Sequence, residues 1–239
     1  MPSVEPWSTP PGGESSRAPS GCSTSGMTAA IRLVIQARLS STRFPGKVLA
    51  PVNGRAIIAH VVARIATTFP ISNVIVATSA LESDDPLAAY GEKLGVAVFR
   101  GPLDDVFTRF QLCLRAYPCD WAFRVSADSP LFDPGLIPLL SAFADRADID
   151  LVTNVFPRTF PRGHSLEMIR SSTLLGIDAS GLTPYQREHV TPVFYDNPNT
   201  YRIVNLESGD PLKARINLCV DTVEDLQRVE ELARETTSC

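Results

Sequence analysis

The stretch Ile31–Leu49, IRLVIQARLSSTRFPGKVL, joins a short apolar run to a polar loop. Its first six residues are mostly aliphatic and β-branched, which is typical of a buried strand. The loop that follows carries three cations (Arg38, Arg43 and Lys47), three consecutive hydroxyls and a Pro-Gly pair. We therefore expect the fold to begin with a strand whose carboxyl end is densely positive.

Strand-like and helix-like segments alternate beyond this loop. Short β-branched runs at 73–78, 96–99 and 121–126 are separated by segments at 55–69 and 104–117 with helical spacing of apolar residues. Alternation of this kind predicts a mostly parallel sheet covered by helices on both faces.

The second half of the chain is less regular. Its expected elements are a helix at 184–194 and strands at 150–155, 164–169, 201–206 and 214–220. We find no internal repeat. These elements predict one α/β domain whose second half mixes strands and inserts a segment for substrate or dimer contacts.

A final helix is expected to begin at Thr222. Asp225 lies three residues after this N-cap, which is capping-box spacing. The apolar residues expected to face inward are Val223, Leu226, Val229 and Leu232.

Composition limits the classes of partner. With 22 basic and 26 acidic residues the net charge is −4, so nothing favours nucleic acid or an acidic membrane surface. No apolar run approaches the roughly 18 residues of a membrane span. Hydrophobic residues make up 44% of the chain, enough for a buried core. We expect a soluble protein that binds any anion locally.

The cysteines indicate the cellular compartment, and the N-terminal composition indicates where the folded domain begins. The five cysteines are scattered without a CxxC pair, which favours reduced thiols in a cytoplasmic protein. Residues 1–26 are mostly Pro, Ser and Gly and are expected to form a disordered tail without a secretory signal. A single domain should occupy 27–239, and Met27 is a candidate natural start.

The charged loop suits a polyphosphate. Ligands of open α/β sheets bind at the carboxyl ends of strands, where this loop falls. Each charge-assisted hydrogen bond contributes about 1.5 to 3 kcal/mol. The Walker pattern GxxxxGK[ST] is absent. A lone arginine would more simply be a solvated side chain, so this interpretation depends on the combined spacing RxxSTRxPGKxL.

That spacing resembles the N-terminal signature of the CMP-sugar cytidylyltransferases, closest to the spore coat polysaccharide biosynthesis protein F branch. The resemblance runs from about residue 31 to 232 and includes FRGPLDDVFTRF (99–110), FRVSADSPLFDP (123–134), FPRTFPRGHSLEMI (156–169), YQREHVTPVFYDNP (185–198) and RINLCVDTVEDL (215–226). It implies a Rossmann-like nucleotide-diphospho-sugar transferase fold. It also implies transfer of CMP from CTP to an acidic sugar, with release of pyrophosphate, for surface polysaccharide or glycan biosynthesis.

The resemblance implies a CTP site built largely on the first loop. Arg38 and Lys47 would contact the phosphates and take part in catalysis. The other implied nucleotide-binding residues are Gln36, Ala37, Ser41, Arg43 and Asp105. For Asp105, which begins an expected helix, stabilisation of the helix dipole is an equally good account.

Asp128 and Asp221 are the implied Mg²⁺ ligands, and Asp128 is also implied in catalysis. Each follows an expected strand, so both should reach the same end of the sheet. Mg²⁺ is a hard cation that prefers oxygen ligands. It would neutralise charge on the α-phosphate during in-line attack by the sugar hydroxyl. Taken singly, Asp128 would more simply shape a turn and Asp221 would cap a helix.

The resemblance also implies an acceptor-sugar site and a homodimer. The implied acceptor-binding residues are Arg109, Arg158, Arg162, Glu167 and His189. His164 and Ser165 stand where the family usually has Leu-Asp, which leaves the identity of the sugar open.

Two other functions fit parts of the sequence. A glycosyltransferase of related fold would use a DxD motif, and Asp148-Ile149-Asp150 has that form. A non-catalytic nucleotide-binding subunit would explain the altered residues His164 and Ser165. Such a subunit needs neither Asp128 nor Asp221, which favours the enzyme.

Overall fold

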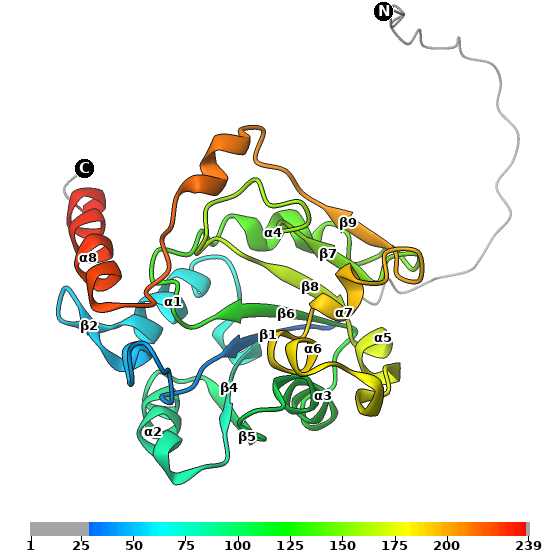
Figure 1. Cartoon of the computed structure of the whole chain (residues 1–239), viewed down its shortest axis with the longest axis horizontal. Helices are drawn as coiled ribbons and strands as arrows, with labels where there is room; N and C mark the ends of the chain where they lie inside the picture. Colours follow the sequence, from blue (N-terminus) through cyan, green and yellow to red (C-terminus); the bar gives the residue numbers. More distant parts are fainter. Residues whose placement is uncertain (1–28, 238–239) are drawn as a thin grey trace, which may run out of the picture.

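A seven-stranded sheet forms the centre of the fold in the computed structural model, which describes residues 29–237 (Figure 1). Four strands are parallel neighbours: β5 (Ala97–Gly101), β4 (Val74–Ser79), β1 (Ile31–Gln36) and β6 (Trp121–Ser126). Three shorter strands continue the sheet: β8 (Glu167–Arg170), β7 (Leu151–Thr153) and β9 (Ile203–Asn205). Because β8 runs antiparallel to both β6 and β7, the second half of the sheet is mixed, as predicted.

Alternating side chains of the strands build a core on each face. Leu33 and Ile35 of β1 pack with α1 (Ile57–Ile65), α2 (Asp85–Lys93) and α4 (Leu136–Ser141). Val34, between them, faces the other core. The helices of that core are α3 (Val106–Ala116), α5 (Ser171–Gly176) and α7 (Pro192–Tyr195). The helices on both faces confirm the predicted layers.

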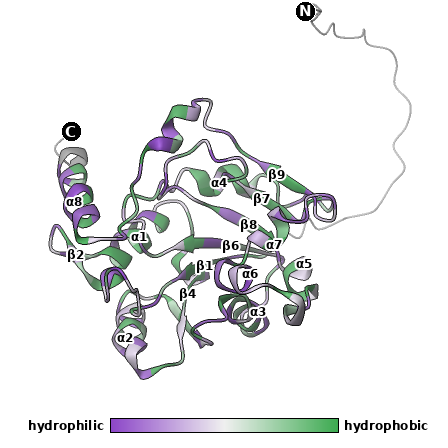
Figure 2. Cartoon of the chain, viewed as in Figure 1, coloured by the Kyte–Doolittle hydropathy of each residue, from purple (hydrophilic) through white to green (hydrophobic). Residues whose placement is uncertain are grey.

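A small hairpin joins the last helix to the domain. Its strands are β2 (Pro51–Val52) and β3 (Arg55–Ala56), and Val52 packs with Val229 of α8 (Val223–Thr237). Figure 2 shows both hydrophilic and hydrophobic residues on α8, as expected for a helix that buries one side.

The first four expected strands are confirmed to within two residues. The helix expected at 55–69 is shorter, because Arg55 and Ala56 pair with β2 and the helix ends at Ile65. The helix expected at 104–117 appears as α3. The apolar residues of α1 lie in the core, as its spacing predicts.

Three expectations for the second half were wrong. The helix expected at 184–194 is divided into α6 (Pro184–His189) and α7, because Val190 adopts a φ of 68°. Residues 214–220 form no strand: the 3₁₀ helix η5 (Pro211–Arg215) occupies the start of that stretch. Val223 is 50% exposed and does not face inward.

The predicted cap of α8 is confirmed. The backbone N–H of Asp225 donates to Oγ1 of Thr222 at 3.2 Å, and the N–H of Thr222 donates to Oδ2 of Asp225 at 3.1 Å. Asp225 also accepts from the backbone N–H of Asp221 at 3.0 Å. The cap therefore fixes the backbone beside Asp221.

The predictions about membrane spans, cysteines and the N-terminal tail concern residues that the structure describes only in part. Among residues 29–237 no helix combines the length and apolar character that a bilayer crossing requires. Cys113, Cys119 and Cys219 are free thiols. The tail predicted at 1–26 and the candidate start Met27 lie outside the described residues.

Candidate nucleotide-binding site

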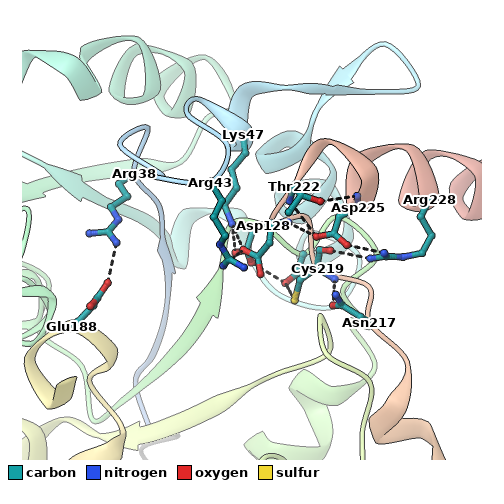
Figure 3. A network of polar contacts seen from close by, with 12 residues as sticks. Arg38, Arg43, Lys47, Asp128, Glu188, Asn217, Cys219, Thr222, Asp225 and Arg228 are labelled. Atoms are coloured by element: carbon teal, nitrogen blue, oxygen red, sulfur yellow. Dashed lines mark hydrogen bonds and ion pairs between the residues drawn. The ribbon is translucent and has the colours of Figure 1, made fainter.

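Three segments that are far apart in sequence meet at the carboxyl end of the parallel strands (Figure 3). Lys47 belongs to η1 (Lys47–Leu49), Asp128 follows β6, and Asp221 precedes α8. Nζ of Lys47 donates to Oδ2 of Asp128 and to Oδ1 of Asp221, each at 2.8 Å. Arg43 lies 3.0 Å from the same Asp221 oxygen. The structure thus joins the predicted phosphate loop to both predicted metal ligands.

The charges in this cluster support one another. Burial disfavours the charged form of Lys47, but attraction and hydrogen bonds from Asp128 and Asp221 outweigh it and raise the pKa of its ammonium group. Lys47 therefore carries its charge at neutral pH. A fixed cation of this kind is available to a phosphate without a change of protonation.

A buried carboxylate anchors the start of the phosphate loop. Asp84 is fully buried and accepts from the backbone N–H of Leu39 at 2.8 Å and of Ser79 at 3.0 Å. Burial opposes the charge of Asp84, but hydrogen bonds from Ser79, Leu39 and Thr78 outweigh it. These bonds keep the pKa of Asp84 below its ordinary value. The carbonyl of Leu39 accepts from Gly46, whose φ of 74° suits glycine. The loop is therefore closed at Leu39 and tied to the end of β4.

A cavity of about 420 Å³ opens at this cluster. The sequence-predicted residues on its wall are Gln36, Ala37, Arg38, Ser41, Arg43, Lys47, Asp128, His189 and Asp221. A second cavity, of about 600 Å³, adjoins it and includes Asp105. Arg38, Thr42 and Glu188 line both. We call these the first and the second cavity.

Asp105 has a structural role as well as a place on the second cavity. It caps α3 by accepting from the N–H of Thr108 at 2.9 Å, and it pairs with Arg187 at 2.5 Å. Burial acts against the negative charge of Asp105, but these bonds lower its pKa. Its capping role alone explains why an acidic residue stands there.

The structure buries Arg109 away from the walls of both cavities. Its side chain is fully buried and donates to the carbonyls of Pro102 and Leu103 at 2.8 and 3.3 Å. Burial, with repulsion from Arg38, lowers the pKa of Arg109 to about 10. Arg109 lines neither cavity.

Three other expected acceptor residues lie off the cavity walls. Arg158 donates to Oγ of Ser165 at 2.9 Å, and Arg162 is exposed beside the 216–218 segment. Both oxygens of Glu167 are taken by other side chains, described below. None of the three lines the first or second cavity. The expected DxD residues Asp148 and Asp150 do not line them either.

Sequence reasoning missed several residues of the cavities. Arg124 and Ser126 of β6 line the first cavity, Arg187 lines the second, and Glu188 lines both. Arg124 had a visible signal, because a charged residue interrupts an otherwise apolar strand. Glu188 had no such signal, since its place depends on how α6 packs.

Asp128 and Asp221 carry the oxygen ligands that magnesium prefers. One oxygen of each lies 2.8 Å from Nζ of Lys47, so the two carboxylates converge on this ammonium group. Carboxylate oxygens suit a hard cation that keeps part of its water shell. Residues 29–237 contain no group of three acidic, His or Cys side chains able to hold a metal.

The parallel strands, the cationic loop and the paired aspartates define a nucleotide-binding α/β protein. A model of the cytidylyltransferase family matches residues 33–237. The chain belongs to this family, as its sequence motifs predict.

Two curated relatives align over most of their length. The chain is 31% identical over 210 residues to spore coat polysaccharide biosynthesis protein SpsF of Bacillus subtilis, covering 84% of this chain and 85% of the relative. It is 32% identical over 202 residues to the uncharacterized protein MJ1063 of Methanocaldococcus jannaschii, covering 84% and 82%.

Solved structures agree with the fold. A cytidylyltransferase from Leptospira borgpetersenii superposes with a TM-score of 0.79 at 28% identity, covering 88% of this chain and 96% of that one. A CMP:2-keto-3-deoxy-manno-octonic acid synthetase complexed with CTP gives a TM-score of 0.66 at 20% identity, covering 87% and 100%. The predicted nucleotide-diphospho-sugar transferase fold is confirmed.

Proposed function

We propose that this protein transfers CMP from CTP to an acidic sugar and releases pyrophosphate, in the biosynthesis of a surface polysaccharide or glycan. The observation that carries the proposal is the meeting of Arg43 and Lys47 with Asp128 and Asp221 at one sheet edge. The similarity to SpsF supports a role in polysaccharide biosynthesis. The 8-amino-3,8-dideoxy-manno-octulosonate cytidylyltransferase of Shewanella halifaxensis, 32% identical over 130 residues, supports an acidic acceptor.

The loop would bind the triphosphate. Lys47 and Arg43 supply fixed positive charge, and Arg38 lies on the wall shared by the two cavities. Phosphoryl transfer depends on positioning and on stabilising charge, both of which this set can provide. The charged side chains would stabilise the leaving pyrophosphate without a covalent enzyme intermediate.

Asp128 and Asp221 would hold Mg²⁺. When bound there, the ion would neutralise charge on the α-phosphate oxygens. Lys47, which bonds to one oxygen of each carboxylate, would hold the two aspartates side by side. Removal of divalent ions with a chelator should abolish activity, and added Mg²⁺ should restore it.

We also propose a cytoplasmic homodimer. The substrates CTP and a free sugar favour the cytoplasm, and the family resemblance favours the dimer. Light scattering should give twice the chain mass of 25.9 kDa. A monomer at micromolar concentration would contradict the dimer and leave the enzyme activity open to its own test.

Pyrophosphate release with Mg²⁺ tests the activity. Each of the four ribonucleoside triphosphates is paired with acidic and neutral sugars, and we expect release with CTP and an acidic sugar. Asp128→Asn and Asp221→Asn should each abolish it, whereas Asp148→Asn, at an exposed aspartate paired with Arg146, should not. Full activity in both site variants would overturn the mechanism. Turnover of a nucleotide sugar without CTP would indicate a glycosyltransferase instead.

A further inference from the structure

Arg124 is a charged side chain within an otherwise apolar strand. The other residues of β6 before Ser126 are buried, and the side chain of Arg124 is 19% exposed on the wall of the first cavity. A largely buried guanidinium is costly unless it is paired and hydrogen-bonded. The groups bonded to Arg124 therefore set the orientation of its side chain.

Neighbouring strands hold Arg124 from two sides. Nη1 donates at 2.6 Å to Oε2 of Glu167, the residue directly opposite in the antiparallel β6–β8 register. Nε donates at 3.1 Å to Oε1 of Gln36, on β1. Since the guanidinium is planar, two bonds on different nitrogens fix its orientation.

Glu167 is in turn held by a tyrosine. The hydroxyl of Tyr195 donates to Oε1 of Glu167 at 2.6 Å and lies 3.1 Å from Oγ1 of Thr153. Burial, then the charge of Glu167, raises the pKa of Tyr195, so this hydroxyl keeps its proton. The side chain of Glu167 is 4% exposed and both of its oxygens are bonded. A satisfied polar network of this kind is rigid.

One amino group of Arg124 is left for a ligand. Within residues 29–237 neither bond of the guanidinium involves Nη2. This nitrogen is also not among the buried side-chain atoms that lack a partner. It is therefore accessible, and Arg124 lines the first cavity.

Arg124 lies apart from the phosphate cluster. It stands two residues before the end of β6, roughly 7 Å back along the strand. Its partner Glu167 is on β8, on the side of β6 away from β1 and β4. A ligand that meets Arg124 therefore lies over β6, back from its carboxyl end, whereas the phosphate loop follows β1.

We propose that Arg124 recognises a carboxylate of the acceptor sugar through Nη2, and that Glu167 and Tyr195 are positioning residues. The inference rests on the proposed function and assigns its acid specificity to one side chain. A guanidinium N–H and a carboxylate form a charge-assisted hydrogen bond, which is stronger than a neutral one. Arg124 thereby selects acidic over neutral acceptors.

The test compares the acidic and neutral forms of one acceptor. The probes are 3-deoxy-manno-octulosonate, or the acidic sugar that proves active in its place, and the methyl ester of the same sugar. Arg124→Gln should raise the KM for the acid roughly 10- to 100-fold and leave that for the ester little changed. Arg32→Gln, at an arginine of β1 bonded to Asn73, is the matched control and should keep the acid preference.

Calorimetric measurement of CTP binding distinguishes a failure of this inference from a failure of the proposed function. Arg124→Gln should change CTP affinity far less than acid affinity, because Nη2 meets the acceptor and only Nε bonds to Gln36. Two outcomes would overturn the role of Arg124 and leave the proposed function standing. In the first, the variant keeps its preference for the acid over the ester. In the second, it loses as much affinity for CTP as for the acid. If the wild-type protein uses no acidic sugar, the proposed function fails and this inference fails with it.

Glu167→Gln tests the positioning role. The substitution keeps the size of the side chain but removes the charge that orients Arg124. We expect a reduced preference for the acid over the ester with unchanged CTP affinity. A lower stability with the full acid preference would show that Glu167 is only structural.

Discussion

Arg38 and Glu188 form an ion pair of 3.0 Å on the boundary between the two cavities (Figure 3). They belong to the first loop and to α6, and both side chains are partly exposed. The pair connects the two sides of the cleft. A triphosphate that binds Arg38 would compete with Glu188 for the same guanidinium.

Removal of Glu188 should therefore strengthen CTP binding. An exposed ion pair contributes at most about 1 kcal/mol, so Glu188→Gln should lower the Kd for CTP by roughly fivefold or less. Calorimetry measures this, with the exposed Glu207→Gln as control. Weaker CTP binding in Glu188→Gln would indicate that Glu188 contacts the nucleotide.

Lys47 should be required for turnover more than for folding. Loss of one group that stabilises developing charge typically lowers kcat by about 10²- to 10³-fold, and we expect this of Lys47→Met. Circular dichroism and urea unfolding check that the variant is folded. A folded variant with normal kcat would remove Lys47 from the mechanism.

Asp84→Asn should destabilise the protein and weaken CTP binding together. The amide cannot replace a carboxylate that accepts from Leu39, Thr78 and Ser79, and one lost buried bond costs about 1 to 3 kcal/mol. Urea unfolding and the KM for CTP measure the two effects. The neighbouring exposed Asp85→Asn is the matched control.

The pH dependence of the Asp84 contribution has a defined sign. Because its pKa is lowered in the folded protein, the contribution is complete above the ordinary value of 3.8 and is lost as pH falls through the folded value. The difference in unfolding free energy between wild type and Asp84→Asn should therefore shrink in acid. An unchanged difference at low pH would contradict the role of the charge.

His164 should make stability fall in mildly acidic solution. Burial lowers its pKa from the ordinary 6.5, and Nε2 lies 3.1 Å from the carbonyl of Leu131. Below pH 6.5 the unfolded chain takes up a proton that the folded protein resists, so the unfolding free energy decreases until the folded pKa is reached. His164→Gln should flatten this slope, with His189→Gln as the control for an exposed histidine.

Local patterns predicted the strands and the site loop well. Residues 121–126 were predicted as a strand and form β6 with the same bounds. Asp128 and Asp221 were predicted to reach the same end of the sheet as the charged loop; Lys47 contacts both and Arg43 contacts Asp221, because strand ends of a parallel sheet lie at one edge. Residues that directly follow parallel strands in the sequence therefore also lie close together in the structure.

Local sequence patterns did not predict which side chains from distant segments pair with one another. Glu167 was predicted to contact the acceptor, which stays a prediction; its bond to Arg124 was not foreseen, because β8 enters the sheet antiparallel to β6 in a register that no local signal specifies. The break at Val190 was missed for a similar reason, since a valine at positive φ is held there by its surroundings. Arg109 was implied as an acceptor-binding residue by the family resemblance, but its side chain is fully buried.

The two anchors described above are separate: Asp84 ties the loop to the end of β4, while Glu167 on β8 orients Arg124. No hydrogen bond joins these two carboxylates in the described part of the chain, so the free-energy costs of changing both should be additive. If Arg124 contacts the acceptor as proposed, selection could alter that contact without disturbing the anchor of the phosphate loop. This modularity would let one ancestral scaffold diversify into enzymes that activate different sugars.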